Sequence, residues 1–324
     1  MMSLTCTARV VRPDREAIAA AARVLSGGGL VAFPTETVYG LGADASNGAA
    51  VARLYAAKGR PRFNPLIAHV ADLAAARRLA RFNADAELLA RVFWPGPLTL
   101  VLPKAEGCPV SQLAAAGLDT IAVRVPDHPV ARDILEAFGK PVVAPSANQS
   151  GHVSPTTASH VRADLDGRVD LIVDGGPTSV GVESTIVACL GMATLLRPGG
   201  IARRDIERVL GHAVADAAPL SDAAPLSPGL LASHYAPKTP LRLNAVDVRP
   251  GEALLAFGAD APKGAVQTLN LSGSGDPVEA AANLFSHLRA LDAAGAKAIA
   301  VMPIPPEGLG EAINDRLIRA AAPR

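Results

Sequence analysis

The chain has 324 residues, of which 49% are hydrophobic, and this length predicts roughly two domains with a large core. A formal net charge of +1 excludes a whole-protein field that would draw the chain to nucleic acid or to a membrane surface. Any basic site must therefore be local. No apolar run approaches the roughly 20 residues of a membrane span, so the sequence predicts no association with a membrane.

The cysteines and the N-terminus indicate a cellular compartment. Cys6, Cys108 and Cys189 are isolated and form no CxxC pair, so we expect reduced thiols. The first residues carry charges early and lack the apolar segment of a signal peptide. Both features predict a cytoplasmic protein.

The first elements follow from caps and apolar runs. Asp14 is a good N-cap for a helix that continues to about Leu25, where a run of three glycines ends it. The apolar run Leu30–Phe33 lies between those glycines and a proline, which predicts a buried strand. A turn is expected after it, at Gly40 and Gly42.

A second helix is expected from Asn47 to Lys58, with Gly59 as the residue that ends it. Ser154 followed by proline predicts the start of another helix. The remaining elements expected in the first 210 residues are two helical segments in 71–93, helices at 129–138 and 203–210, and strands at 98–102, 120–125, 141–145, 169–173, 184–190 and 194–197.

The composition changes after residue 210. Residues 211–240 are rich in alanine and proline and have little periodicity, which predicts a linker, although 227–237 reads SPGLLASHYAP and contains Tyr235. Strands at 241–243, 253–257, 266–271 and 298–302 and helices at 279–294 and 311–321 are expected beyond it. This alternation predicts a small α/β domain with parallel strands. We therefore divide the chain into a catalytic domain (1–210), a linker or lid (211–240) and a C-terminal domain (241–324).

Three cations, Lys58, Arg60 and Arg62, follow the helix that ends at Gly59. In an extended chain alternate residues share a face, so Lys58 and Arg60 would contact one anionic ligand together near the surface. The alternative is that cations favour helix C-termini through the helix dipole and are simply solvated.

Named nucleotide-binding loops do not fit the sequence. Residues 40–45 match GxGxxA, but six residues separate them from the strand and cations replace the expected acid. Residues 176–181 have the glycine spacing of a P-loop, but Val182 and Glu183 stand where lysine and a hydroxyl residue are required. A nucleotide site would instead combine the cations with strand-end hydroxyls and amides. A helix N-terminus at Ser154 would suit a phosphate, although plain capping is the favoured explanation of Ser154, and both roles are compatible.

Two further residues have alternative interpretations. Arg124 lies inside a predicted strand, where an arginine must pair with an acid or face a cleft. His69 is more often a satisfied core or surface histidine than a ligand. The sequence has no HExxH motif and no cluster with the spacing of metal ligands.

Eight motifs occur in order from Phe33 to Gly200: FPTETVYGLG, AKGRP, NPLI, FWPGPLT, TIAVRVPDH, APSANQSG, GVESTI and LLRPGG. Together they make the chain resemble the YrdC-type threonylcarbamoyl-AMP synthases, and residues 227–324 resemble the long, two-domain form of that enzyme. The resemblance implies an α/β fold, with a YrdC-like twisted mixed sheet and helices followed by a smaller Rossmann-like domain.

The resemblance also implies a reaction. A nucleotidyltransferase of this family joins L-threonine, bicarbonate and ATP into threonylcarbamoyl-AMP and pyrophosphate, the first step towards threonylcarbamoyladenosine in tRNA. Mg²⁺ would be held mainly by phosphates rather than by protein side chains. The expected partners of the product are the tRNA threonylcarbamoyl-transferase machinery and, weakly, tRNA itself.

Residue roles are implied in the same way. The catalytic signature falls on Lys58, Arg60, Ser146 and Asn148. The implied ATP contacts are Lys58, Arg60, Asn64, Thr120, Ser146, Ser154, Arg197 and Tyr235. The implied threonine contacts are Thr37, His69, Arg124, the main chain of Ala144, and Ser184.

Two alternatives come from other functional classes. An RNA-binding module could hold RNA phosphates on a cationic face, although the net charge of +1 argues against it. A carbamoyl transfer enzyme of the same fold usually carries zinc-finger and acylphosphatase modules, and we find neither in this sequence.

Overall fold

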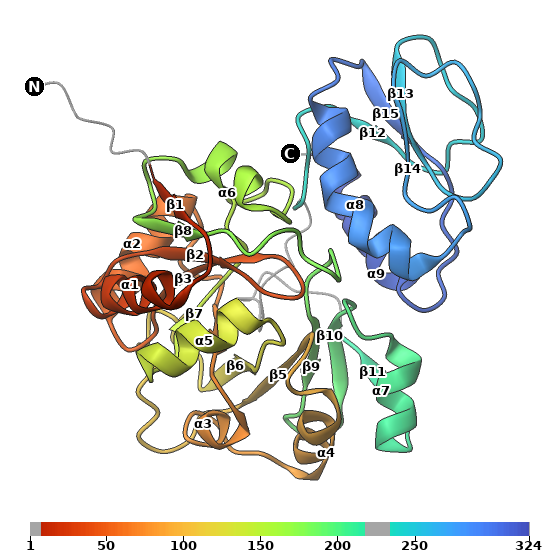
Figure 1. The fold of residues 1–324 in the computed structure, drawn as a ribbon. Coiled ribbons are helices and arrows are strands. Elements are labelled where there is room, and N and C mark those ends of the chain that lie inside the picture. Colours follow the sequence, from red (N-terminus) through yellow and green to blue (C-terminus); the bar gives the residue numbers. More distant parts are fainter. Residues whose placement is uncertain (1–7, 218–233, 324) are drawn as a thin grey trace, which may run out of the picture.

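The structure is a computed structural model in which residues 8–217 and 234–323 are described. Within these residues the strands form one sheet of eleven strands and one of four, each with its own helices (Figure 1). Side by side, the strands of the larger sheet are β1 (Arg9–Val11), β8 (Leu171–Val173), β2 (Val31–Pro34), β3 (Tyr39–Asp44), β7 (Val142–Val143), β4 (Ile67–His69), β6 (Thr120–Arg124), β5 (Leu98–Pro103), β9 (Thr185–Ala188), β10 (Thr194–Arg197) and β11 (Ala215–Asp216).

Neighbouring strands of this sheet run both ways: β2 is parallel to β8 and antiparallel to β3, and β4 is parallel to β6. Its helices are α1 (Arg15–Ser26), α2 (Gly48–Lys58), α3 (Leu73–Arg77), α4 (Ala84–Phe93), α5 (Pro129–Phe138), α6 (Ala158–Leu165) and α7 (Arg203–Leu210). A mixed sheet with helices and a smaller second domain confirms the expected fold class.

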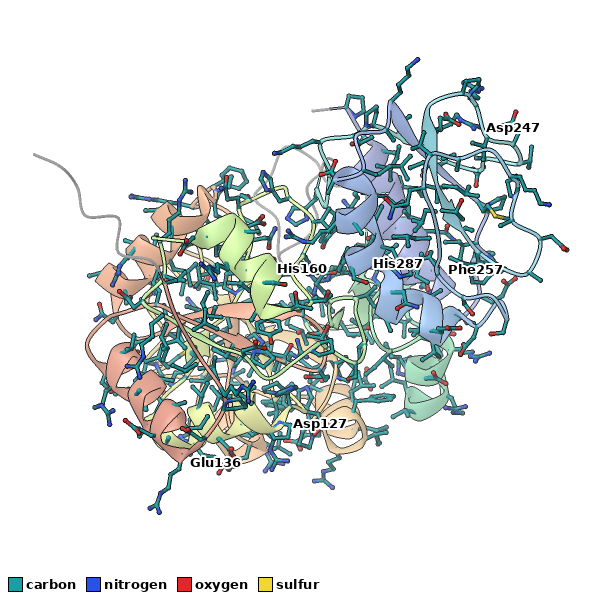
Figure 2. All side chains as sticks on the ribbon, turned by 45° about the horizontal axis from the view of Figure 1, so that its top comes forward. Asp127, Glu136, His160, Asp247, Phe257 and His287 are labelled. Atoms are coloured by element: carbon teal, nitrogen blue, oxygen red, sulfur yellow. The ribbon has the colours of Figure 1, made fainter. Side chains whose placement is uncertain are left out.

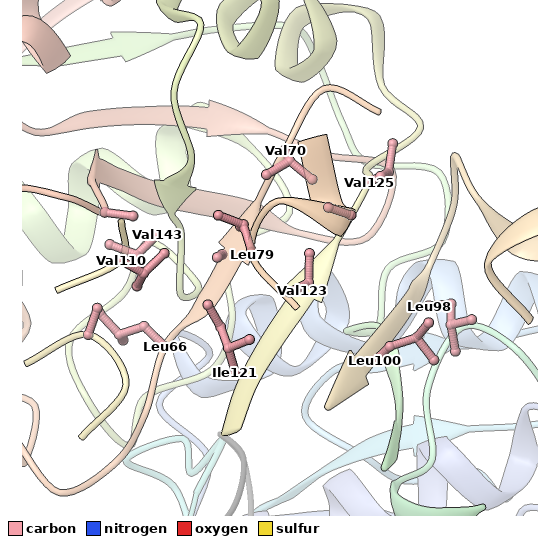
Figure 3. Close-up of a cluster of buried hydrophobic side chains, with 14 of the residues drawn as sticks. Leu66, Val70, Leu79, Leu98, Leu100, Val110, Ile121, Val123, Val125 and Val143 are labelled. Carbon is pink, nitrogen blue, oxygen red and sulfur yellow. The ribbon is translucent and has the colours of Figure 1, made fainter. Parts of the chain in front are cut away.

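Side chains alternate between two cores, as they must in a strand. Val31 and Phe33 of β2 pack with α1 and α5, whereas Ala32 joins the larger core on the opposite face of the sheet. In that larger core Val123 of β6 lies near Leu100 of β5 (Figure 3). Because β4 and β6 are buried on both faces, residues at their ends are held in fixed positions.

The predicted caps are confirmed at two helices. The Asp14 side chain accepts a hydrogen bond from the Ala17 amide at the start of α1. The Asn47 side chain does the same for the first turn of α2, and Gly59 ends that helix at φ 60°. A positive φ is one that glycine adopts without a steric cost, which explains the sharp stop.

Two predictions were wrong. Gly40 and Gly42 do not form a turn but lie within β3, where a Cβ on Gly42 would meet Phe33 at 2.7 Å. These glycines let neighbouring strands and side chains approach closely. The helix expected at Ser154 is α6, which begins at Ala158 with Thr157 as its cap. The Ser154 hydroxyl instead donates to Glu183, so it is not available to cap a helix.

The smaller sheet has the order β12 (Leu241–Arg242), β15 (Ala298–Val301), β13 (Glu252–Ala256) and β14 (Thr268–Asn270). All its pairs are parallel, as predicted, and its helices are α8 (Pro277–Asp292) and α9 (Gly310–Ala321). No helix in the described residues is both long and apolar enough to cross a membrane.

The smaller sheet's helices contact the larger domain closely. A Cβ on Gly181 would lie 2.4 Å from the backbone of Ala282 in α8, and Arg289 of α8 pairs with Asp164 of α6 at 2.9 Å. Figure 2 labels His160 of α6 and His287 of α8, the two helices that this ion pair joins. Within the stretch expected to be a linker, Ala215–Asp216 extend the large sheet as β11. Residues 218–233, with most of the 227–237 motif, lie outside the described residues.

Candidate active site

A cavity lies where strand ends of the large sheet meet His234 and Tyr235, which shortly precede the small domain. It is lined by Thr37, Val38, Arg60, Ile67, His69, Arg124, Ala144, Pro145, Ser146, Glu183, Ser184, Arg197, His234 and Tyr235. Its free volume is about 50 Å³, which is room for a water molecule or two. The cavity therefore collects chemically active side chains but is nearly filled by them.

Arg124, at the end of β6, anchors one side of the cavity. Its Nη2 donates to Oε1 of Glu36 at 2.5 Å and its Nη1 to the hydroxyl of Thr37 at 3.0 Å. Its Nε donates to the carbonyl of Gly96 at 3.3 Å. The prediction that Arg124 must pair or face a cleft is confirmed, because Arg124 does both.

His69 is held beside Arg124 because the two residues are partners in the parallel ladder of β4 and β6. Its Nδ1 lies 3.2 Å from the carbonyl of Ile67. Burial, and then the charge of Arg124, lower the pKa of His69 to about 3. The imidazole is therefore neutral at physiological pH and can act as a hydrogen-bonding group but not as a cation. Ala144 follows β7 and lines the same side of the cavity.

Arg60 and Arg197 supply two further cations to the cavity wall. Arg60 donates to the carbonyls of Asn64 and Pro65 at 3.4 and 3.1 Å, and burial is the main cause that lowers its pKa to about 10. The Nη2 of Arg197, at the end of β10, donates to the carbonyl of Ser184 at 2.9 Å. The Ser184 hydroxyl in turn lies 2.8 Å from that of Thr99. Arg60 and Arg197 are thus fixed by backbone carbonyls.

The expectation for Lys58 was wrong in two respects. Lys58 is 2% exposed rather than near the surface, and it does not line the cavity beside Arg60. Its Nζ donates to the carbonyls of Ser146 and Asn148, at 2.5 and 2.6 Å. The left-handed Gly59 explains the difference, because it turns the chain between the two cations, whereas the shared face assumed an extended backbone. Burial, and then the charge of Arg60, lower the pKa of Lys58.

Two buried amides have acceptors without a donor. Asn64 and Asn148 are each 1% exposed, and the Oδ1 of each has no hydrogen-bond partner in the part of the chain that the structure describes. The Nδ2 of Asn148 is bonded, to the carbonyls of Gln149 and His152. A buried acceptor left without a donor is costly, and such groups commonly mark a ligand position.

The cavity thus unites only part of the expected site. The expected residues that line it are Thr37, Arg60, His69, Arg124, Ala144, Ser146, Ser184, Arg197 and Tyr235. The expected residues outside the lining are Lys58, Asn64, Thr120, Asn148 and Ser154. Thr120 begins β6, four residues before Arg124, and pairs with Pro103. Ser154 donates its hydroxyl to Oε1 of Glu183 at 2.5 Å.

Sequence reasoning assigned no role to Glu36, Glu183, His234 or Arg316, which lie in or behind the cavity wall. Glu36 lies in FPTETVYGLG and Glu183 in GVESTI. An acid inside a motif that otherwise consists of hydroxyl or apolar residues could have indicated that these two residues belong to the site. Arg316 interrupts the apolar stripe of α9, three residues after Ile313, and an arginine on a core face is a comparable signal.

Tyr235 closes the cavity from the side of the small domain. It is 1% exposed, has φ 61°, and its ring stacks on that of Phe285 in α8 at 5.6 Å between centroids. His234 meets it edge-on at 4.1 Å, and burial lowers the pKa of His234 to about 3. The amide of Ala236 donates to the carbonyl of Gly151, which ties this segment to the large domain.

Metal ligands are not assembled by the described residues. Residues 8–217 and 234–323 contain no group of three or more histidine, cysteine, aspartate or glutamate side chains placed to hold a metal ion. The acids nearest the cavity, Glu36 and Glu183, are already paired with arginines. Cys108 and Cys189 are free cysteines, and burial raises the pKa of Cys189 to about 12.

Comparison with known proteins extends over nearly the whole chain. A family described as "Telomere recombination" matches residues 23–199, and one described as "Threonylcarbamoyl-AMP synthase, C-terminal domain" matches residues 201–322. The chain is 43% identical to a threonylcarbamoyl-AMP synthase of Bacillus subtilis, over 95% of this chain and 93% of the relative. It is 41% identical to a threonylcarbamoyl-AMP synthase of Pyrococcus abyssi, over 94% of each chain.

A solved structure, P. abyssi Sua5 complexed with L-threonine, has the same fold. It matches with a TM-score of 0.88 and 38% identity, and the match covers 97% of this chain and 96% of that one.

Proposed function

The chain belongs to the threonylcarbamoyl-AMP synthase family, in its two-domain form, and we propose that it makes threonylcarbamoyl-AMP and pyrophosphate from L-threonine, bicarbonate and ATP in the cavity described above. This reaction makes the chain an enzyme of the nucleotidyltransferase class. The product supplies the threonylcarbamoyl group for the modified adenosine of tRNA.

The observation that carries the proposal is the environment of Arg124. Its hydrogen bonds among the described residues use three of its five N–H groups, which leaves two for a ligand in the cavity. A planar guanidinium with two free donors suits a carboxylate. We assign the carboxylate of threonine to Arg124, its polar side chain and amine to Thr37, His69 and Ser184, and a further contact to the main chain of Ala144. The L-threonine bound to the P. abyssi protein supports threonine as a ligand of this fold.

The other two arginines of the cavity wall suit the phosphates of ATP. Arg60 and Arg197 line the cavity and are fixed by carbonyls, so they provide charge that needs no reorganisation. Lys58 holds the Ser146 and Asn148 carbonyls from behind, which keeps the Ser146 hydroxyl at the cavity wall. We assign the partnerless Oδ1 atoms of Asn64 and Asn148 to donors of the nucleotide. The other residues that we assign to ATP are Thr120, Ser154 and Tyr235.

The chemistry follows from these charges. The amine of threonine adds to bicarbonate, with loss of water, to give an N-carboxylate, and that anion attacks the α-phosphorus of ATP while pyrophosphate leaves. Both reactants are anionic, so Arg60 at the cavity wall reduces their repulsion and stabilises the leaving pyrophosphate. Lys58 contributes from behind the wall, through the Ser146 and Asn148 carbonyls. Mg²⁺ would neutralise the phosphate oxygens. Paired acids at the cavity and the lack of a metal-ligand cluster among the described residues fit an ion held by phosphates and water.

We further propose the division into catalytic domain (1–210), linker (211–240) and C-terminal domain (241–324), with the linker acting as a lid. The place of His234 and Tyr235 in the wall of a cavity with little free volume supports this, because their movement would enlarge the cavity for ATP. A lid would protect the mixed anhydride of the product from water. Cytoplasmic location and transfer of the product to the tRNA-modifying machinery belong to the same proposal. Neither an RNA-binding module nor a carbamoyl transfer enzyme is favoured by the relatives.

Pyrophosphate release tests the function directly. We expect release to require threonine, bicarbonate and ATP together, and each other standard amino acid to give little. Equal release with any amino acid, or with none, would contradict the synthase. In a separate titration, tRNA binding that falls steeply with salt, without pyrophosphate release, would indicate the RNA-binding alternative.

A further inference from the structure

Arg316 of α9 is a buried cation that the proposed chemistry does not use. It is 0% exposed and does not line the cavity. Its Nε donates to Oε2 of Glu183 at 2.8 Å, its Nη1 to Oδ2 of Asp315 at 2.5 Å, and its Nη2 to the carbonyl of Pro198 at 3.0 Å. Asp315 in turn accepts from Arg319 at 3.0 Å, so it has a second cation of its own. Its guanidinium carbon lies 5.1 Å from the centre of the Tyr235 ring. A side chain of the small domain thus touches two residues of the cavity wall from behind.

Glu183 is the first of these two wall residues. Its Oε1 accepts from the Ser154 hydroxyl at 2.5 Å while its Oε2 accepts from Arg316, so both oxygens are bonded. Burial raises its pKa, but the charges of Arg316 and Arg197 outweigh burial and hold the pKa below the ordinary value. Glu183 is therefore ionised. It directly precedes Ser184, whose carbonyl fixes Arg197.

An ionised carboxylate is out of place in a wall that faces phosphates. Without a partner, Glu183 would repel a polyanion and would compete for the cations that should bind it. Arg316 offsets this charge from outside the cavity, so Glu183 competes less with phosphates for Arg60 and Arg197. The pair thus lets Glu183 keep its hydrogen bond with Ser154 while its charge repels the phosphates of ATP less.

Tyr235 is the second wall residue. Phe285 stacks on its ring and the Arg316 guanidinium also lies against it, so the phenol is held between a ring and a cation of the small domain. A cation over a desolvated aromatic ring is attractive. Since φ of Tyr235 is 61°, a conformation that non-glycine residues seldom adopt, side-chain contacts must hold the residue in place.

We propose that Arg316 is a positioning residue for ATP, which neutralises Glu183 and orients Tyr235 without touching the nucleotide. The proposal rests on the proposed function, because it assumes that ATP occupies this cavity. It makes the small domain part of the nucleotide site, since loss of α9 contacts would change the charge and the shape of the cavity wall together.

A purely structural ion pair is the alternative. Two apolar residues can replace a buried ion pair at little cost to stability, whereas removal of one partner leaves an uncompensated buried charge. The two roles therefore separate when stability and the two substrate KM values are measured on the same variants. A structural pair would affect folding and kcat alike. A positioning pair would affect the KM of ATP in particular.

The test compares Arg316→Met, Arg316→Lys and the double variant Glu183→Gln/Arg316→Met by pyrophosphate release, with thermal unfolding measured in parallel. Because Arg316→Met leaves the Glu183 charge bare, we expect it to raise the ATP KM by about tenfold or more, with the threonine KM changed by less than about threefold. The double variant should return the ATP KM to within about threefold of wild type, since it removes both charges. Arg316→Lys should lie between wild type and Arg316→Met.

Arg203→Met is the matched control. It breaks another ion pair to α9, that of Arg203 with Glu311 at 2.8 Å, but touches no residue of the cavity wall. Both KM values should stay unchanged in this variant. If Arg316→Met does not fold, Arg316→Lys and the double variant decide the question. An unchanged ATP KM in the folded Arg316 variants, or no recovery in the double variant, would overturn the proposal.

Calorimetric measurement of ATP binding to the wild-type chain separates a failure of the proposed function from a failure of the inference about Arg316. A wild-type chain that neither binds ATP nor releases pyrophosphate would overturn the proposed function, and this inference with it. A wild-type chain that does both, with Arg316 variants of normal ATP KM, would overturn this inference alone.

Discussion

The two sides of the cavity each contain a buried arginine–glutamate pair, but the pairs face in opposite directions. On the side assigned to threonine, Arg124 lines the cavity and Glu36 stands behind it, 2.5 Å away. On the side formed with the small domain, Glu183 lines the cavity and Arg316 stands behind it, 2.8 Å away. The same pair therefore has a different use on each side.

The difference follows from what each wall should receive. A cation at the wall with an acid behind it is oriented and keeps two N–H groups that its bonds among the described residues do not use. An acid at the wall with a cation behind it is cancelled, so the wall no longer repels phosphates. The first arrangement selects a carboxylate, and the second makes an acid tolerable beside a nucleotide.

The largest expected effect comes from Arg60. It lines the cavity and, among the described residues, it bonds to backbone carbonyls rather than to an acid. We predict that Arg60→Ala reduces kcat by about 10²–10³, because it removes a fixed charge at the developing pyrophosphate. Lys58→Ala should have an effect of similar order by releasing the Ser146 and Asn148 carbonyls. Steady-state pyrophosphate release measures both, and circular dichroism checks the fold.

The exposed Arg62, two residues beyond Arg60, provides the control. Arg62→Ala should keep wild-type turnover. If Arg60→Ala also kept wild-type turnover, Arg60 would have no role in catalysis.

A smaller effect is expected from a change that keeps the charge of Arg124. Arg124→Lys loses the fork that fits a carboxylate and also loses bonds to Glu36 and Thr37. The threonine KM should rise by about tenfold and the ATP KM by less, since one good charge-assisted bond is lost. Separate titrations of threonine and ATP measure this. A raised ATP KM with an unchanged threonine KM would assign Arg124 to the nucleotide. It would then contradict the proposal that the Arg124–Glu36 pair serves the carboxylate of threonine.

The smallest effect concerns pH, and here the two sides should behave alike. His69 and His234 have pKa values of about 3 in the folded chain, chiefly because both are buried, against an ordinary value of 6.5. Between pH 6.5 and 3 the unfolded chain therefore binds more protons than the folded chain. The free energy of unfolding should fall as pH falls through this window.

Urea unfolding of His69→Gln and His234→Gln at pH 7, 5.5 and 4.5 would measure this loss. The free energy of unfolding of each variant should fall less on acidification than that of the wild type. The difference should correspond to the uptake of roughly one proton fewer on unfolding. His212→Gln is the control, because His212 is exposed and its pKa is raised, first by the Ala213 carbonyl and then by Asp85. An acid response that is equal in all variants would mean that neither buried histidine contributes.

The sequence by itself determined most of the local structure and the family. Caps such as Asp14 and Asn47 and the stop at Gly59 depend on neighbouring residues alone, so they could be predicted from spacing. The family resemblance also identified nine residues that the cavity brings together, seven of them inside the ordered motifs, with His69 and Tyr235 outside them. The helix misplaced at Ser154 marks the limit of such reasoning, because its hydroxyl bonds to Glu183, 29 residues away along the chain.

Only the tertiary structure decided which charges face the cavity. Glu36 and Arg124 are 88 residues apart, and Arg316 lies 133 residues beyond Glu183. Side-chain direction at such distances depends on strand register and domain packing, which no local pattern encodes. The burial of Lys58 had the same cause, since its Nζ donates to the Ser146 and Asn148 carbonyls, 88 and 90 residues away along the chain. The residue types therefore predicted which chemical groups the site contains, and long-range packing determined which of the charged groups face the cavity.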